Sequence, residues 1–234
     1  PDESSTDDLF GFTGRLTFSP IHEKTKAIHL GFSADHSRSQ NRGLGNTDAE
    51  PEIHPGRDIL ETEGAGYREA TTYVLEAAGV YGPLSLQAEY AHSQQKDGFI
   101  SGTSTRAPNV DQDGWYLYGS YFLTGESRNY NWKSGAFKRI NVKNSLFNGG
   151  WGAWETAVRY SNGDFENIDG TSDTADILTL GLNWYPSNNL RFMVNYVNVL
   201  DGNLGASADL GGDLDTGARA EDADYLIFDA LWFF

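Results

Sequence analysis

The sequence contains no cysteine and no long apolar stretch. Without thiols, disulfides and thiolate metal sites are excluded, and cysteine usage gives no information about the cellular compartment. No window approaches the roughly 18 consecutive apolar residues of a transmembrane helix, which excludes membrane crossing by helices. The N-terminus also lacks a charged segment followed by an apolar one. Either a signal peptide has been removed or the chain begins within a longer protein.

Basic residues are scarce, with 17 Lys and Arg against 33 Asp and Glu and a net charge of −16. This balance argues against nucleic acid or an anionic membrane surface as a partner. The histidines are scattered without metal-ligand spacing: His22, His29, His36, His54 and His92. No Gly-x-Ser-x-Gly nucleophile elbow occurs. We therefore expect no enzymatic activity, no metal site and no cofactor.

Aromatic residues and glycines are abundant, and they accompany many Asn, Ser and Asp residues, a mixture that favours strands and turns over helices. Apolar and polar residues alternate with a period of two along most of the chain. In the first run, Phe10, Phe12, Leu16 and Phe18 alternate with smaller or polar residues. About nine such runs occur, each near the roughly 9–11 residues of a tilted membrane-spanning strand. The run from Leu190 is imperfect, because the apolar Met193 stands at a position where the alternation expects a polar residue. At residues 197–199 the apolar residues also move to the alternate positions.

The connections between these runs alternate in length. Short turns are expected at Ser19–Lys26, Gly82–Pro83 and Pro186–Asn189. Long polar loops are expected at Ser37–Arg68, Ser93–Gln112, Ser161–Ala175 and Asp201–Asp224. This alternation is typical of outer-membrane barrels, which have tight periplasmic turns and long external loops. One connection, residues 125–150, is long where a short turn is due.

A soluble barrel or sandwich would also show a period of two. Two features favour a barrel in a membrane. The apolar parity has aromatic residues at strand ends, as interfacial girdles do: Phe18, Tyr90, Trp115, Trp154, Tyr160 and Trp184. The other parity carries charge in mid-strand, as a water-filled lumen permits. We predict an all-β fold, a transmembrane antiparallel β-barrel, and the mean hydropathy of −0.51 agrees because each strand is only half apolar.

The final run ends the chain on an aromatic residue and keeps apolar residues at every second position: Leu226, Phe228, Ala230, Trp232 and Phe234. It resembles the C-terminal signal by which outer-membrane barrels are recognised for assembly. Nine strands are an odd number, whereas single-chain bacterial barrels have an even one. An open sheet would leave two unpaired edges in lipid, at a cost of several kcal/mol per unsatisfied group. We therefore expect part of a longer barrel, or a barrel closed by other chains.

Three stretches resemble the phosphate-selective porin O and P family. They are Gly14–Pro20 with Ile28–Ser33, Asp113–Tyr116 with Leu123–Tyr130 and Ser134–Phe137, and Gly149–Glu155 with Arg159–Ser161. The resemblance implies a homotrimer of sixteen-stranded barrels in the outer membrane of Gram-negative bacteria. On that template, residues 1–234 are the C-terminal portion of a single porin domain whose N-terminal strands are absent. The implied partners are outer-membrane lipid, lipopolysaccharide and small anions such as phosphate.

The long connection at residues 125–150 is basic, although the chain as a whole is acidic. It carries Arg128, Lys133, Lys138, Arg139 and Lys143 against a single acid, Glu126. We expect this segment to fold from the periplasmic side into the lumen, as the corresponding segment of the family does. There its bases would concentrate anions by focusing the field in a narrow passage. The alternative is a solvated periplasmic loop.

Three further arginines, Arg15, Arg159 and Arg191, lie on the polar parity of their strands. An arginine on the lipid face would destabilise the barrel by about 2–4 kcal/mol near the middle of the bilayer. We therefore expect these three side chains to point into the lumen. They either line the anion path or pair with Glu76, Glu89 and Glu155 on neighbouring strands.

The sequence thus predicts a porin for passive diffusion of small anions. Two alternatives stay open: a structural or adhesive barrel that presents acidic loops, and a channel for sugars or organic solutes that uses Tyr116, Tyr118 and Tyr185. The acidic loops match no calcium-binding spacing, so we interpret them as solvated external loops.

Overall fold

The computed structural model describes residues 9–39, 48–49, 60–61, 65–203 and 224–232. Its main feature is one antiparallel sheet of nine strands in the order β1-β2-β6-β7-β9-β12-β13-β14-β15. These strands are β1 (Leu9–His22), β2 (Lys26–Ser39), β6 (Glu69–Tyr81), β7 (Leu84–Lys96), β9 (Val110–Phe122), β12 (Ala153–Glu166), β13 (Ser172–Ser187), β14 (Leu190–Asn203) and β15 (Asp224–Trp232). The prediction of an all-β antiparallel sheet of about nine strands is confirmed.

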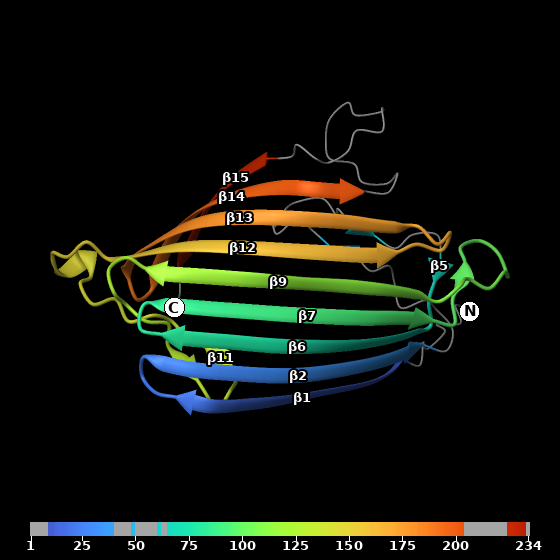
Figure 1. Cartoon of the computed structure of the whole chain (residues 1–234), viewed down its shortest axis with the longest axis horizontal. Coiled ribbons are helices and arrows are strands. Elements are labelled where there is room, and N and C mark those ends of the chain that lie inside the picture. The colour runs from blue at the N-terminus through green and yellow to red at the C-terminus, as the bar shows by residue number, and fades with distance from the viewer. Residues whose placement is uncertain (1–8, 40–47, 50–59, 62–64, 204–223, 233–234) are drawn as a thin grey trace, which may run out of the picture.

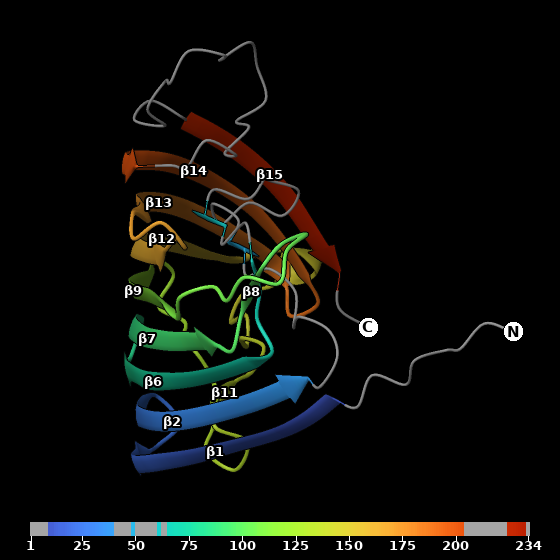
Figure 2. The same ribbon diagram turned by 90° about the vertical axis from the view of Figure 1, so that its right-hand side faces the viewer.

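The sheet is a single curved layer in which each strand pairs with its neighbour in the sequence of long strands (Figures 1 and 2). Eight of the nine strands have 13–16 residues, longer than the alternation predicted. The difference is clearest at residues 161–175, expected as a long loop. There β12 and β13 continue in register to Glu166↔Ser172, which leaves only residues 167–171 as the connection. Most residues at these strand ends are polar, so the alternation between apolar and polar residues ends before the strands do.

Short elements lie in the long connections. They are β3 (Asp48–Ala49), β4 (Leu60–Glu61), β5 (Ala65–Gly66), β8 (Phe99–Ile100), β10 (Tyr130–Asn131), β11 (Ala136–Phe137) and a 3₁₀ helix, η1 (Leu146–Asn148). They form three two-stranded pairs: β3 with β4, β5 with β8, and β10 with β11. In both views β11 lies beside β2, far from the β9 and β12 strands that its segment connects (Figures 1 and 2).

Proline explains two of the irregularities in register. Pro20 and Pro186 each lie within a shift of pairing, between Phe18 and Ile21 and between Trp184 and Ser187. Proline has no N–H to give to a ladder, so it is accommodated where pairing is interrupted.

The two faces of the sheet differ in the way that the alternation predicts. Large apolar side chains are exposed on the convex face; Phe12, Leu30, Leu180 and Phe228 are between 46% and 71% exposed. The aromatic residues near the strand ends lie on the same face, where Trp154, Trp184 and Phe192 stack in a row with ring centroids 5.6–5.7 Å apart. The apolar parity therefore does not form a sealed core, which a soluble sandwich would require.

The concave face holds the buried clusters. One consists of Leu60 against Phe165, Ala175, Ile177, Val197 and Val199. Val197 and Val199 are fully buried there, while Asn198 between them donates to Asp224 of β15 at 2.6 Å. At residues 197–199 the apolar side chains of β14 therefore point to the concave face, because Leu60 packs against this part of that face.

Candidate functional site on the concave face

The segment between β9 and β12 runs along the concave face from β9 to β1. The Tyr130 hydroxyl lies 2.6 Å from Nδ1 of His29 on β2, and the Trp132 ring lies 5.0 Å from the His22 ring on β1. Gly135 lies so close to β1 that an added Cβ would stand 3.1 Å from Thr17. The segment therefore passes over β7, β6 and β2, a lateral distance of about 19 Å at the spacing of sheet strands.

A buried ion pair fixes the root of this segment. The Arg128 guanidinium donates to Glu155 on β12 at 2.5 Å and to the Tyr118 hydroxyl at 2.9 Å. Glu155 is completely buried and also accepts from Asn183 at 3.1 Å and from the Tyr185 hydroxyl at 2.8 Å. Every contact of this carboxylate is a donor, so its charge is compensated in a site where an unpaired charge would be costly.

The guanidinium of Arg128 stays protonated in this site. Burial opposes its charged form, but the Glu155 carboxylate and the neighbouring tyrosines outweigh that effect and raise the pKa of Arg128 above its usual value. Arg128 therefore anchors the segment to the sheet and is not an open site for a solute.

A second anchor closes the base of the segment. Glu126 is 1% exposed and accepts from the Thr124 hydroxyl and, at 3.1 Å, from the backbone N–H of Lys143. The Lys143 ammonium donates to the carbonyl of Gly125. Ile140 packs with Phe122, Ala153 and Tyr185 in a buried cluster. Lys143 is thus turned back on its own segment.

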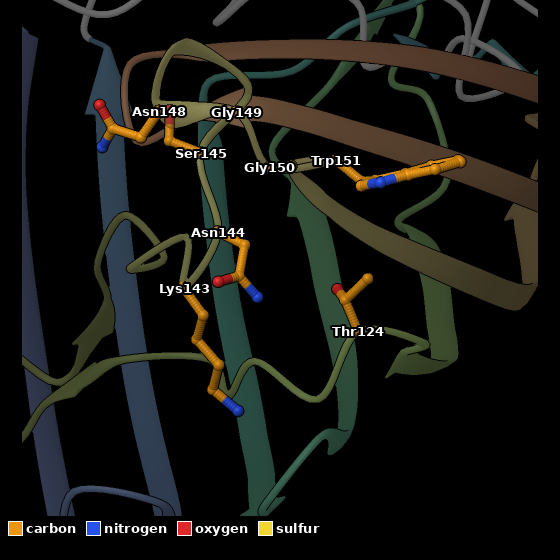
Figure 3. A pocket seen from close by; sticks show the side chains of 9 residues that line it. Thr124, Lys143, Asn144, Ser145, Asn148, Gly149, Gly150 and Trp151 are labelled. Carbon is orange, nitrogen blue, oxygen red and sulfur yellow. The ribbon is translucent and has the colours of Figure 1, made fainter.

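A shallow pocket of about 340 Å³ opens at this base (Figure 3). Glycines form part of its wall because the chain doubles back tightly: a Cβ on Gly150 would stand 2.3 Å from the Asn144 carbonyl oxygen. Lys143 and Trp151 point to different sides of the pocket (Figure 3). The cation therefore does not face the indole across it.

The remaining predicted bases of the segment are exposed: Lys133, Lys138 and Arg139. Lys133 lies 5.8 Å from the ring of Trp132, beside which it stands in the sequence. The segment brings these three cations along the concave face, whereas Arg128 and Lys143 hold it in shape.

The wall arginines are engaged in different ways. Arg15 on β1 forms two hydrogen bonds of 2.6 Å with Glu76 on β6, across the intervening strand β2. This reach is possible because Gly31 lies between them; a Cβ there would stand 2.8 Å from Glu76. Glu76 is also 3.3 Å from Nε2 of His29. Of the two roles expected for Arg15, the geometry supports pairing with a carboxylate on a nearby strand.

Arg159 and Arg191 lie against tyrosine rings on the same face. The Arg159 guanidinium is 4.1 Å from the Tyr116 centroid, and that of Arg191 is 5.9 Å from the Tyr185 centroid. Tyr116 in turn donates to Glu89 at 2.7 Å. Of the three carboxylates proposed as partners, Glu76 pairs with Arg15, Glu155 with Arg128, and Glu89 with a tyrosine.

His29 and Tyr130 are the residues that sequence reasoning missed. Their contact joins residues 101 positions apart, and no local pattern carries such a pairing. A signal did exist, since Tyr130 ends the stretch from Leu123 that resembles the family. The structure gives that stretch a physical meaning, because Glu126, Arg128 and Tyr130 are its three anchoring side chains.

The apolar parity of β15 faces outward, with Leu226, Phe228 and Trp232 between 60% and 70% exposed. Phe234, the last residue of the predicted assembly signal, lies outside the described residues, as does most of the acidic loop sequence at 40–64 and 204–223. The assembly role stays a prediction.

Among the residues that the structure describes, no group of three or more His, Asp or Glu side chains is arranged to hold a metal ion. No helix in the described part of the chain is long and apolar enough to cross a membrane.

Comparison with known proteins gives a family and two curated relatives. The sequence model of the phosphate-selective porin O and P family matches residues 2–206. Porin O of Pseudomonas aeruginosa is 26% identical over 84% of this chain and 49% of its own length. An uncharacterised protein of Caulobacter vibrioides is 30% identical over 94% of this chain and 44% of its own length. The chain thus spans about half the length of the curated relatives that it matches.

Two solved structures of the outer membrane protein OmpT of Vibrio cholerae also match, one of them in a trimer form. That form has a TM-score of 0.45 and 13% identity, and covers 95% of this chain and 56% of the matched chain. The other has a TM-score of 0.41 and 11% identity, and covers 94% and 64%.

Proposed function

Because the chain belongs to the phosphate-selective porin O and P family, we propose that it forms part of an outer-membrane channel for passive diffusion of small anions. The family membership and the Porin O relative locate the chain in the bacterial outer membrane. In this proposal the convex face contacts lipid and the concave face borders water. The proposed activity is that of a channel and not of an enzyme.

The observation that carries the anion preference is the placement of charge on the concave face. The wall carboxylates Glu76 and Glu155 each bond to an arginine at 2.5–2.6 Å, which compensates their charge locally. The segment at 125–150 adds Lys133, Lys138 and Arg139, which are exposed. We infer from these three cations that the local field favours anions, although the whole chain is acidic and Glu89 on the same wall meets only the Tyr116 hydroxyl.

Weak, successive sites suit diffusion better than one tight site. An anion must bind favourably enough to enter and weakly enough to leave. Exposed lysines on a segment that crosses the passage meet this requirement, because solvent screens each of them. Arg128 is not such a site, because its guanidinium is already occupied by the buried carboxylate of Glu155.

The test is the reversal potential across a planar bilayer with a salt gradient. The wild-type channel should prefer the anion, and the double variant Lys138→Glu/Arg139→Glu should lower that preference or invert it. Lys24→Glu, in the turn between β1 and β2, is the control for a charge reversal at a single residue outside the segment. A cation-preferring wild type would contradict the proposal, and an unchanged double variant would contradict the role of the segment.

The tyrosines that suggested a sugar channel are occupied. The Tyr116 hydroxyl donates to Glu89, the Tyr118 hydroxyl accepts from Arg128, and the Tyr185 hydroxyl donates to buried Glu155. These contacts take up the hydroxyl groups that a sugar would use, so no observation here favours the sugar channel. A structural or adhesive barrel would give no conductance in the same bilayer experiment.

A homotrimer is proposed on the family resemblance alone. Lipid and lipopolysaccharide are proposed as its surroundings because the convex face is apolar.

A further inference from the structure

His29 is a titratable side chain that the proposed ion path does not use. It lies on the concave face of β2 and is 5% exposed. Its Nδ1 atom lies 2.6 Å from the Tyr130 hydroxyl of the 125–150 segment, and its Nε2 atom lies 3.3 Å from a carboxylate oxygen of Glu76 on β6. The imidazole ring therefore joins the basic segment to the wall.

Both protonation states of this imidazole keep the two contacts. A carboxylate only accepts hydrogen bonds, so in the neutral ring Nε2 carries the proton towards Glu76 and Nδ1 accepts from the Tyr130 hydroxyl. In the protonated ring Nδ1–H donates instead, and the Tyr130 oxygen accepts, because a phenol can take either role. His29 can thus gain a charge while the segment stays in place.

The carboxylate beside His29 is already compensated by an arginine. Arg15 on β1 donates two hydrogen bonds of 2.6 Å to Glu76, and it also reaches the Gly135 carbonyl of the segment at 3.4 Å. A proton taken up by His29 therefore does not neutralise an isolated carboxylate. It adds one positive charge to this part of the wall.

The other charged groups of this region lie on β7, β12 and the segment. Glu89 on β7 stands opposite Glu76 in the strand register, and its carboxylate accepts from the Tyr116 hydroxyl at 2.7 Å. The Arg159 guanidinium on β12 lies 4.1 Å from the centroid of the same tyrosine ring. On the segment, the exposed cation nearest in sequence to the tether is Lys133. Carboxylates, lysines and arginines of ordinary strength keep their charge between about pH 5.5 and 8, whereas a histidine changes its charge in this interval.

We propose that His29 determines how strongly the channel prefers anions, and that it does so according to pH. The protonated ring adds a positive charge beside the segment, so the preference for anions is stronger below neutral pH. A charge within a wall of low dielectric acts over a longer distance than a charge in water, so it reaches ions in the passage. The inference rests on the proposed channel activity and names a further residue that sets its selectivity.

The experiment measures the reversal potential of the full-length protein in a planar bilayer under a KCl gradient, at pH 8 and at pH 5.5. The test variant is His29→Gln, which keeps a polar side chain but cannot gain a charge. The matched control is His36→Gln. His36 lies on the same strand but on the convex face, where it pairs with Phe12 in the register and its Nδ1 atom is 2.9 Å from the Thr71 hydroxyl. Circular dichroism checks that each variant keeps its β-sheet.

Lowering the pH from 8 to 5.5 should raise the ratio of chloride to potassium permeability of the wild type about twofold or more at low salt, because one unit charge is added near the ion path. His36→Gln should show the same rise, and His29→Gln should show none. Tyr130→Phe should keep the rise, because it removes the hydrogen bond to the segment but leaves the titrating ring.

An equal rise in the wild type and in His29→Gln would overturn the inference, and so would a wild type whose permeability ratio does not change with pH. Loss of the rise in Tyr130→Phe would also overturn it, because the effect would then follow the hydrogen bond and not the charge.

The channel proposal is judged separately, by the sign of the reversal potential at pH 8. A channel that prefers cations contradicts that proposal, yet it still shows the shift between the two pH values if His29 gains a charge. For a protein that does not conduct, NMR of the histidine ring signals in detergent gives the answer. The signal that is missing in His29→Gln should move between pH 8 and pH 5.5, and a signal that stays fixed would overturn the inference.

Discussion

The most consequential single contact is the ion pair between Arg128 and Glu155. It joins the root of the concave segment to β12, and Glu155 is fully buried. The two residues come from two of the stretches that resemble the family, Leu123–Tyr130 and Gly149–Glu155, so the resemblance in sequence corresponds to one physical contact. Arg128, which the sequence suggested for the anion path, thus also holds the segment to the sheet.

Replacing Arg128 with Ala should destabilise the protein by about 3–5 kcal/mol, because Glu155 would stay buried without its counter-charge. Urea unfolding in detergent, followed by tryptophan fluorescence, measures this loss. Lys133→Ala, on the same segment but exposed, should change stability by less than about 0.5 kcal/mol. If the two variants were equally stable, Arg128 would not be an anchor.

At the scale of elements, the 125–150 segment is the unit that defines the site. Its root is held by Arg128 and Glu126, and its far end by Tyr130 and Gly135 against β1 and β2. Between these anchors it bears exposed cations. One end of the segment is fixed to β9 and β12 and the other to β1 and β2. Because these strands are separated by β6 and β7, the segment is held across the concave face.

Tyr130→Phe removes the hydroxyl that meets His29 and should loosen the far end by about 0.5–1.5 kcal/mol, the net value of one hydrogen bond. The expected result is greater open-channel current noise, with the mean anion preference nearly unchanged, measured in single-channel recordings. Tyr196→Phe is the matched control, because that hydroxyl donates to Asp224 on the other face. Equal noise in the two variants would count against the tether.

At the scale of the whole molecule, the sheet separates two environments. The convex face is largely apolar and exposed, and the concave face carries the Arg15–Glu76 and Arg128–Glu155 pairs, His29 and the basic segment. A substitution should therefore have an effect that depends on the face and on the depth along the strand.

Leu117→Arg places a charge at the middle of β9 on the convex face and should cost about 2–4 kcal/mol in a lipid bilayer. Leu84→Arg, at the start of β7 on the same face, should cost about 0–1 kcal/mol because it lies near the interface. Unfolding titrations in liposomes compare the two. An equal cost for both would argue against a membrane around this face.

Much of the fold could be predicted because successive residues of a strand face opposite sides of the sheet, so the hydropathy of each residue indicates its environment. Phe12, Leu30, Leu180 and Phe228 all lie on the face that the alternation assigned to them. The ends of strands were less well predicted. Beyond the apolar band most residues at the ends of β12 and β13 are polar, and the apolar ones, Phe165 and Ala175, lie on the concave face under Leu60. The alternation that marks the strands therefore ends before their hydrogen bonds do.

The candidate site was predicted only in part. Clustered charge marked the 125–150 segment, but charge alone did not distinguish Arg128, which is partly buried and paired with Glu155, from Lys138, which is exposed. The partner of Arg15 is Glu76, on a strand that is not its neighbour, and the contact depends on the missing side chain of Gly31. Such a contact has no period and no local spacing.

The sequence by itself determined the sheet, its two faces and the location of the basic segment, because these follow from hydropathy and charge along the chain. Only the tertiary structure decided which cations are anchors and which are exposed, where the segment ends, and that Leu60 covers an apolar part of the concave face. These depend on distances between residues far apart in the chain, which are set when the sheet curves and its connections pack against it.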